Sequence, residues 1–306
     1  MLTRVLVSGA TGFIGSALLR RLAGDGIAVR RLVRRAPAAG SDDREWDPSR
    51  GVIDPRALDD VDAVVHLSGA RIDQRWSESV ERELRESRIR STELLARAIA
   101  SAPVRPRVLV SGSAIGVYGD RGDEPLDERS APGTGFLAGL CVDWEAAARP
   151  AADAGVRVVH PRTGIVLGAH GGALARMLPP FKLGVGGPTG SGRQWMSWIA
   201  LADMVEALLF ALRTETLAGP ANFVAPEPVR NADFARTLGH VLHRPAVLPT
   251  PKLALSLLFG REMVEATLLA SQRATPRALL DAGFGFAHPR LEDALRAALR
   301  IDGSAV

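Results

Sequence analysis

The first half of the chain alternates between short apolar runs and longer segments whose apolar residues recur every three or four positions. The apolar runs are RVLVSG, IAVRRLVRR, VDAVVHLSGA, PRVLVSGS and VRVVHPRTGIVL. Runs of this length, rich in β-branched residues, predict buried strands. The segments between them, including FIGSALLRRLAGDG and residues 77–101, have apolar positions at helical spacing. They predict amphipathic helices that connect the strands.

This alternation predicts the fold class. Apolar strands alternating with helices are typical of a parallel sheet covered on both faces. Because crossovers between parallel strands are right-handed, the simplest topology is a Rossmann-type, doubly wound α/β sheet. From about residue 163 the pattern changes to a glycine-rich loop and then to short helices separated by prolines. We therefore expect a dinucleotide-binding domain of residues 1–162 plus about 195–215, and a smaller, mostly helical substrate lobe of residues 163–194 and 216–306.

Composition narrows the classes of partner. Of 306 residues, 46% are hydrophobic, which is enough for a sizeable core, and the net charge is only +4. Arginines alternate with acids in SESVERELRESRIRSTELLARAIAS, which predicts ion pairs on a solvated helix face rather than a nucleic-acid surface. No apolar run is long enough to cross a bilayer. The single cysteine, Cys141, excludes an intramolecular disulfide and favours a cytoplasmic location. The sequence does not indicate an oligomeric state.

A glycine pattern follows the first predicted strand. The segment LVSGATGFIGSALL places Gly9, Gly12 and Gly15 between that strand and the first helix. The first glycine permits a tight turn, the second lets backbone N–H groups approach a pyrophosphate, and the third allows close packing of helix on sheet. The positive end of the helix dipole then favours the anion. The pattern predicts a dinucleotide site.

The end of the second strand distinguishes the two nicotinamide cofactors. Sites that prefer NAD place an acidic residue there, whereas this chain has Arg34 and Arg35, preceded by Arg30 and Arg31. A guanidinium group suits the 2′-phosphate of NADP. We therefore expect NADP rather than NAD. Because four arginines cannot all face one phosphate, some of them belong to a solvated basic edge.

Several motifs resemble a known superfamily. GATGFIG, VDAVVHLSGA and SGSAIGVYGD are similar to segments of the extended short-chain dehydrogenases/reductases. WDPSRG, RTGIVLG, QWMSWI and the stretch from Glu262 to Leu295 resemble a subfamily of NAD(P)-dependent, nucleoside-diphosphate-sugar-epimerase-like proteins with its own C-terminal domain. The resemblance implies that Arg34 meets the adenosine phosphate and that Ser113 lies near the nicotinamide. It assigns further cofactor contacts to Gly9, Thr11, Gly12, Phe13, Ile14 and Gly15, and to Leu67, Ser68 and Gly69.

The catalytic pair of this superfamily does not match the sequence. Its members use a Tyr-x-x-x-Lys pair, in which the lysine holds the nicotinamide ribose and the tyrosine exchanges a proton with the substrate. The corresponding positions here are Leu137 and Cys141, which cannot do this chemistry. Ser113 and Tyr118 remain as candidate catalytic residues. For Tyr118, the only tyrosine, anchoring a loop at the strand end is the alternative.

The substrate side is predicted from the segment GSGRQWMSWI. Arg193, Gln194 and Trp195 follow a glycine loop, and a cation beside an aromatic plane can bind a phosphate and stack on a ring. Packing in the core is the alternative for Trp195. His240 and His243 are three residues apart without a third ligand nearby, so no metal site is expected.

Two functions are compatible with these features. The first is an NADP-dependent oxidoreductase or epimerase-like enzyme that acts on a small polar molecule, phosphorylated compounds included. The second is an NADP-binding sensor or scaffold without redox turnover, which the missing Tyr-x-x-x-Lys pair favours.

Overall fold

A parallel β-sheet forms the centre of the computed structural model, which describes residues 2–300. The strands run in the order β13-β9-β6-β5-β1-β2-β3-β4, and β7 also pairs with β9. Only the β3–β4 pair of this sheet, within the described residues, is antiparallel. The strands are β1 (Arg4–Ser8), β2 (Ala28–Val33), β3 (Arg44–Asp47), β4 (Val52–Ile53), β5 (Ala63–His66), β6 (Val108–Ser111), β7 (Ser113–Ala114), β9 (Arg157–Thr163) and β13 (Gly219–Phe223). The predicted doubly wound α/β fold is confirmed.

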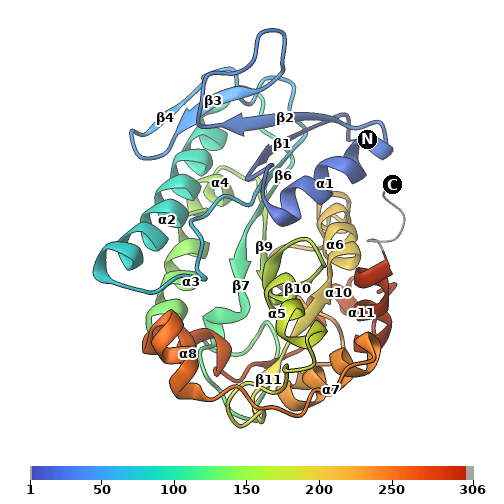
Figure 1. Cartoon of the computed structure of the whole chain (residues 1–306). Helices are drawn as coiled ribbons and strands as arrows, with labels where there is room; N and C mark the ends of the chain where they lie inside the picture. The colour runs from blue at the N-terminus through green and yellow to red at the C-terminus, as the bar shows by residue number, and fades with distance from the viewer. Residues whose placement is uncertain (1, 301–306) are drawn as a thin grey trace.

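Helices cover both faces of the sheet (Figure 1). On one face lie α1 (Phe13–Gly24) and α6 (Leu201–Arg213), and on the other lie α2 (Glu78–Ser101) and α4 (Arg149–Asp153). Side chains alternate along β1, so Val5 and Val7 pack in the core beneath α1 and α6 while Leu6 packs in the core beneath α2. All three are fully buried.

The helical segment between β8 (Pro125–Leu126) and β9 is divided in two. Helix α3 (Phe136–Ala146) ends before α4 begins, and Pro150 occupies the first turn of α4. A proline lacks the backbone N–H that a continuous helix would need, but it is accommodated in a first turn. This break lets α3 and α4 take separate positions.

The remaining elements form a smaller, largely helical lobe. Its core contains Phe181, Trp198, Phe234 and Leu295. Residues 219–223, which the sequence analysis assigned to this lobe, pair with β9 at the edge of the main sheet. The helices here are α5 (Gly172–Lys182), α7 (Asn231–Leu242), α8 (Lys252–Phe259), α9 (Arg261–Met263), η2 (Val264–Leu268) and α11 (Leu291–Arg300), whereas Leu279 of α10 (Arg277–Asp281) packs in the core beneath α1 and α6. The short strands and turn are β8 (Pro125–Leu126), β10 (Ile165–Leu167), β11 (Trp195–Met196), β12 (Trp198–Ala200), β14 (Val229–Arg230), β15 (Arg273–Ala274) and the 3₁₀ helix η1 (Ile115–Tyr118).

Across residues 2–300, no helix is both long and apolar enough to span a bilayer.

Candidate cofactor and substrate site

The turn between β1 and α1 has the geometry that the glycine pattern predicts. Gly9 has φ +69°, and a Cβ there would lie 2.7 Å from the carbonyl carbon of Leu67. A Cβ on Gly15 would lie 2.2 Å from the carbonyl oxygen of Gly9. Both positions therefore need glycine. Gly12 caps α1 without any side-chain hydrogen bond, so the first N–H groups of the helix remain available to an anion.

Phe13 ties the start of α1 to the second lobe. Its ring fills the space where Cβ atoms on Gly168 and Gly171 would lie, at 2.6 and 2.4 Å. A cavity of about 560 Å³ borders Thr11, Gly12 and Phe13 and extends toward β10 and α11. The side chain of Phe13 is thus committed to packing, and its backbone N–H belongs to the helix start.

The loop after β5 lies against this turn. The backbone N–H of Leu67 donates to the carbonyl of Ser8 at 3.3 Å, and Gly69 is exposed. Just before the loop, His66 is fully buried between the hydroxyls of Ser8 (2.6 Å) and Ser91 (3.1 Å). Burial lowers the pKa of His66 to about 4. The imidazole is therefore neutral near pH 7 and acts in packing.

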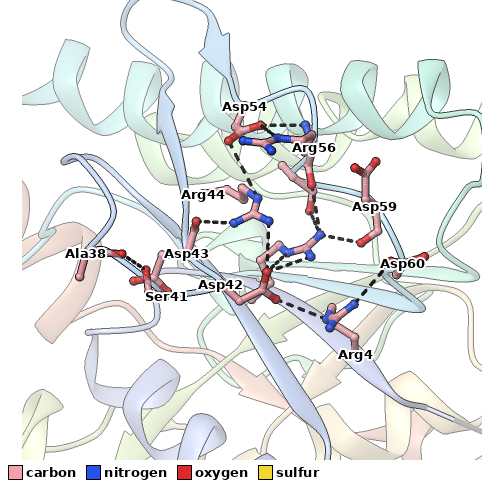
Figure 2. A network of polar contacts seen from close by, with 12 residues as sticks. Arg4, Ala38, Ser41, Asp42, Asp43, Arg44, Asp54, Arg56, Asp59 and Asp60 are labelled. Atoms are coloured by element: carbon pink, nitrogen blue, oxygen red, sulfur yellow. Dashed lines mark hydrogen bonds and ion pairs between the residues drawn. The ribbon is translucent and has the colours of Figure 1, made fainter.

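An ion-pair network holds the outer edge of the sheet (Figure 2). Arg4 and Arg44 both point toward Asp42 and lie 3.3 and 3.2 Å from its oxygens. Arg30, which is 4% exposed, also pairs with Asp42 at 3.0 Å. Arg30 donates further hydrogen bonds to the carbonyls of Arg56, Ala57 and Asp59. Arg30 is a structural residue in this network.

Of the other three arginines at the end of β2, one has a structural partner and two do not. Arg31 donates two hydrogen bonds to Asp43, at 2.7 and 2.6 Å. These bonds raise the pKa of Arg31. Arg34 and Arg35 are exposed, and within the described part of the chain their side chains have no hydrogen bond or ion pair. Two guanidinium groups are thus left for a ligand.

Ser113 belongs to a buried polar network at the end of β7. Its hydroxyl donates to Glu145 at 2.6 Å, and Arg162 donates to both oxygens of the same carboxylate at 2.8 and 2.9 Å. Burial opposes the charge on Glu145, but the bonds from Arg162 and Ser113 keep its pKa below the ordinary value. Ser113 is therefore fixed with its proton directed at Glu145 and its oxygen left to accept.

Tyr118 lies in the interior of the protein and is fully buried. Its hydroxyl is 2.8 Å from Oδ1 of Asn222 and 3.0 Å from the carbonyl of Asp127, and it accepts from Arg162 at 3.2 Å. Burial raises the pKa of Tyr118 although Arg162 opposes the shift. These contacts place the phenol among structural partners.

A second cavity, of about 420 Å³, is lined by two of the residues expected to meet substrate, Arg193 and Gln194. Arg193 is exposed on its wall, with no hydrogen bond or ion pair of its side chain to any residue between 2 and 300. The amide of Gln194 donates to the carbonyls of Thr189 and Leu268, so it shapes the loop. The remaining lining residues include Asp120, Asp123, Arg230, Lys252 and Ser271.

Trp195 lies beside this cavity with cations on its ring. The guanidinium carbons of Arg230 and Arg273 are 4.3 and 4.7 Å from the ring centroid. Its indole N–H donates to Asp123 at 3.2 Å. Each cation–π contact is worth roughly 0.5–2 kcal/mol. The indole therefore organises the basic groups of the cavity.

Comparison with known proteins identifies the family of this chain. A model of the NAD dependent epimerase/dehydratase family matches residues 5–224, which include the glycine turn and the whole main sheet. The chain belongs to the NAD dependent epimerase/dehydratase family. A second model, for a domain of unknown function (DUF1731), matches residues 250–298 of this epimerase-family chain. The resemblance seen in the sequence is thereby confirmed.

Relatives cover nearly the full length of this epimerase-family chain. The epimerase family protein Mb2239 of Mycobacterium bovis is 49% identical over 95% of this chain and 96% of its own. A crystal structure of human epimerase family protein SDR39U1 (isoform 2) with NADPH has a TM-score of 0.88 at 38% identity, covering 97% and 99% of the two chains. MoeE5 in complex with UDP-glucose and NAD shares only the fold, with a TM-score of 0.75 at 22% identity, 98% of this chain and 100% of that one being covered.

The two positions where the superfamily carries its Tyr-x-x-x-Lys pair lie next to η1. A Cβ on Gly116 would be 3.6 Å from Cβ of Leu137 and 3.8 Å from Sγ of Cys141. Burial raises the pKa of Cys141 to about 12, so its thiol stays protonated. Neither residue supplies a charge or an acid at this place.

Sequence reasoning missed two members of the site. Glu145 and Arg162 bind one another and orient Ser113, yet they come from α3 and β9. A signal was present for Arg162, because its charge interrupts a segment expected to be a buried strand, VVHPRTG. Buried charges are normally paired.

Among the described residues no cluster of three or more His, Cys, Asp or Glu could hold a metal ion.

Proposed function

We propose that this epimerase-family protein is an NADP-dependent oxidoreductase or epimerase-like enzyme that acts on a small polar substrate. The observation that carries the proposal is the pair Arg34 and Arg35, which are exposed after β2 and whose side chains form no hydrogen bond or ion pair within residues 2–300. The related human protein, whose structure was determined with NADPH, supports the same choice.

The residues present fit a dinucleotide. The spaces beside Gly9 and Gly15 exclude any side chain, and the α1 N-terminus is free of capping groups. We assign the pyrophosphate to the backbone of residues 11–15, with Leu67–Gly69 along the cofactor. A bound nicotinamide would supply hydride transfer, with NADP preferred over NAD because Arg34 and Arg35 offer positive charge to a 2′-phosphate.

The chain's own residues would position substrate in two places. Ser113, held by Glu145, offers a hydroxyl oxygen as an acceptor near the nicotinamide end. Arg193 offers a guanidinium without an ion pair in residues 2–300, whereas Arg230 and Lys252 in the same cavity are paired with Asp123 and Glu265, each at 2.7 Å. The available guanidinium of Arg193 favours an anionic group, so phosphorylated carbonyl or hydroxyl compounds are the preferred substrates. We retain Tyr118 only as a structural neighbour of Ser113.

The division of the chain follows from this assignment. Residues 1–162 and about 195–215 would bind the cofactor, and the rest would bind substrate, with residues 219–223 extending the main sheet. We place the protein in the cytoplasm because its single cysteine, Cys141, is reduced and buried.

One observation favours a second function, an NADP-binding sensor or scaffold without turnover. Leu137 and Cys141 occupy the positions of the superfamily's tyrosine and lysine and pack on Gly116 instead. Tyr118, the only tyrosine, has its pKa raised by burial although Arg162 opposes the shift, so it is a poor base near neutral pH.

Turnover separates the two functions. Oxidation of NADPH would be followed with a panel of phosphorylated and unphosphorylated carbonyl compounds, for the wild type and for Arg193→Ser. The enzyme proposal predicts turnover with phosphorylated members and a higher KM in Arg193→Ser at unchanged NADPH affinity. Tight NADPH binding with no oxidation across the panel would instead support the sensor.

A further inference from the structure

Arg88, on α2, is a partly buried cation without an acidic partner. Its Nη1 donates to the carbonyl of Leu84 at 3.2 Å and its Nη2 to the carbonyl of Ala70 at 3.0 Å. Among the described residues, no carboxylate lies within ion-pair distance of it. Its neighbour on the same helix, Arg85, pairs with Asp143, and Arg90 pairs with Glu86. Arg97 on this helix is paired as well, with Glu93, whereas Arg88 and the exposed Arg82 have no carboxylate partner within residues 2–300.

The guanidinium of Arg88 has hydrogen-bonding capacity to spare. A guanidinium carries five N–H donors, and two of them are used here. The Nε atom of Arg88 donates to no group within residues 2–300 and is not sealed from solvent, so it can reach a bound molecule. Burial lowers the pKa of Arg88, which reflects the cost of holding a charge here without a counter-charge. Such a group is stabilised when a ligand brings electronegative oxygen.

The position of Arg88 identifies the part of the ligand it can meet. A Cβ on Gly69 would lie 3.2 Å from Cζ of Arg88, so the absence of a side chain at Gly69 makes room for the guanidinium. On its other side, Cζ is 5.2 Å from the ring centroid of Trp144 in α3. Trp144 belongs to the same helix as Cys141, which stands where the superfamily's lysine is expected. Arg88 thus lies where the loop after β5 meets α3.

We propose that Arg88 binds the nicotinamide half of the cofactor, offering its free N–H donors to oxygen atoms of that half. This inference rests on the proposed cofactor site. Arg88 on α2 would supply the positive charge that is absent from α3. Because Gly69 has no side chain, it leaves the space that this guanidinium occupies. Arg88 is a binding and positioning residue here, and no proton is transferred through it.

Two ligands and a matched variant test the assignment. NADPH contains both halves of the cofactor, whereas 2′,5′-ADP contains only the adenosine half with its 2′-phosphate. Calorimetric titrations would compare the wild type, Arg88→Met and Arg85→Met. Arg85 is the control because it lies one turn away on α2 and its charge is already paired with Asp143. Thermal unfolding would establish that each variant is folded.

The proposal predicts that Arg88→Met binds NADPH at least tenfold more weakly than the wild type while its affinity for 2′,5′-ADP changes less than twofold. Arg85→Met should leave both affinities unchanged. Arg88→Lys, which retains the charge, should recover part of the NADPH affinity, and it repeats the test if the methionine variant does not fold.

Two results would overturn the assignment. Unchanged NADPH affinity in Arg88→Met would show that the guanidinium does not contact the cofactor. Equal losses for NADPH and 2′,5′-ADP would show that Arg88 only supports the loop at Ala70. Failure of the wild type to bind either ligand is a different result, because it rejects the proposed cofactor site itself together with this inference.

Discussion

Arg162 donates a hydrogen bond to the hydroxyl oxygen of Tyr118, with 3.2 Å between Nη1 and Oη. The same guanidinium is bound at its other edge by Glu145, which in turn holds Ser113. Ser113 and Tyr118 are therefore the two ends of one buried network. Of the two, only Ser113 is proposed to lie beside the cofactor.

Replacing Tyr118 by phenylalanine should affect stability and spare cofactor binding. The change removes a fully buried hydroxyl and leaves Asn222 short of one partner. The free energy of unfolding should fall by about 1–3 kcal/mol, measured by urea denaturation, with the affinity for NADPH unchanged. A large loss of turnover in a stable, folded variant would make the phenol a catalyst after all.

The glycine turn predicts a contrast between two helix glycines. A Cβ on Gly15 would lie 2.2 Å from the carbonyl oxygen of Gly9, whereas one on Gly24, at the other end of α1, would meet nothing within 4 Å. Gly15→Ala should destabilise the protein by about 3 kcal/mol or more and abolish NADPH binding. Gly24→Ala should be neutral or stabilising by up to about 1 kcal/mol. Equal behaviour of the two variants in unfolding and titration would contradict the role given to the turn.

His66 predicts a pH dependence of stability. Its pKa falls from 6.5 to about 4 on burial, so the unfolded chain binds a proton that the folded chain does not. Stability is therefore lost as the pH falls from 6.5 toward 4, by on the order of 3 kcal/mol. Urea denaturation at several pH values should show this slope, and His66→Gln should reduce it. His160, whose pKa burial also lowers, would leave part of the slope in place. An unchanged slope in His66→Gln would be incompatible with a buried neutral imidazole.

Arg34 should control the choice between the two cofactors. Arg34→Glu should weaken NADPH roughly tenfold to a hundredfold, which corresponds to about 1.5–3 kcal/mol for a charged hydrogen bond, with a smaller effect on NADH. The control is Arg50→Glu, an equal change of charge on the exposed turn between β3 and β4. Equal losses for NADPH and NADH in Arg34→Glu would show that another arginine meets the phosphate.

The sequence predicts the parts of this protein that depend on local patterns. The run of residues 4–8 could be identified as a strand because its centre, Val5 to Val7, is apolar and contains two β-branched valines. The turn at Gly9 could be placed because its positive φ and its close approach to Leu67 both demand glycine. Ion pairs expected on the 77–101 helix are confirmed by Arg90–Glu86 and Arg97–Glu93.

Contacts between distant segments were not predictable in the same way. The difference in role between Arg30 and Arg34 depends on Asp42, a residue of the loop between β2 and β3 that forms an ion pair with Arg30. The pairing of β13 with β9 adds an edge strand through a connection that no local pattern specifies. Arg88 lies in the same charged pattern as its paired neighbours. Its lack of a carboxylate appears only when α2, α3 and the β5 loop are assembled.

The central claim is that the backbone at the start of α1, together with Arg34 and Arg35, binds a nicotinamide cofactor and prefers the one with a 2′-phosphate. Calorimetric titration of the folded wild-type protein with NADPH and with NADH tests this claim most directly. The account predicts saturable binding of NADPH, at least about tenfold tighter than that of NADH. No heat of binding from either cofactor at millimolar concentration would contradict it.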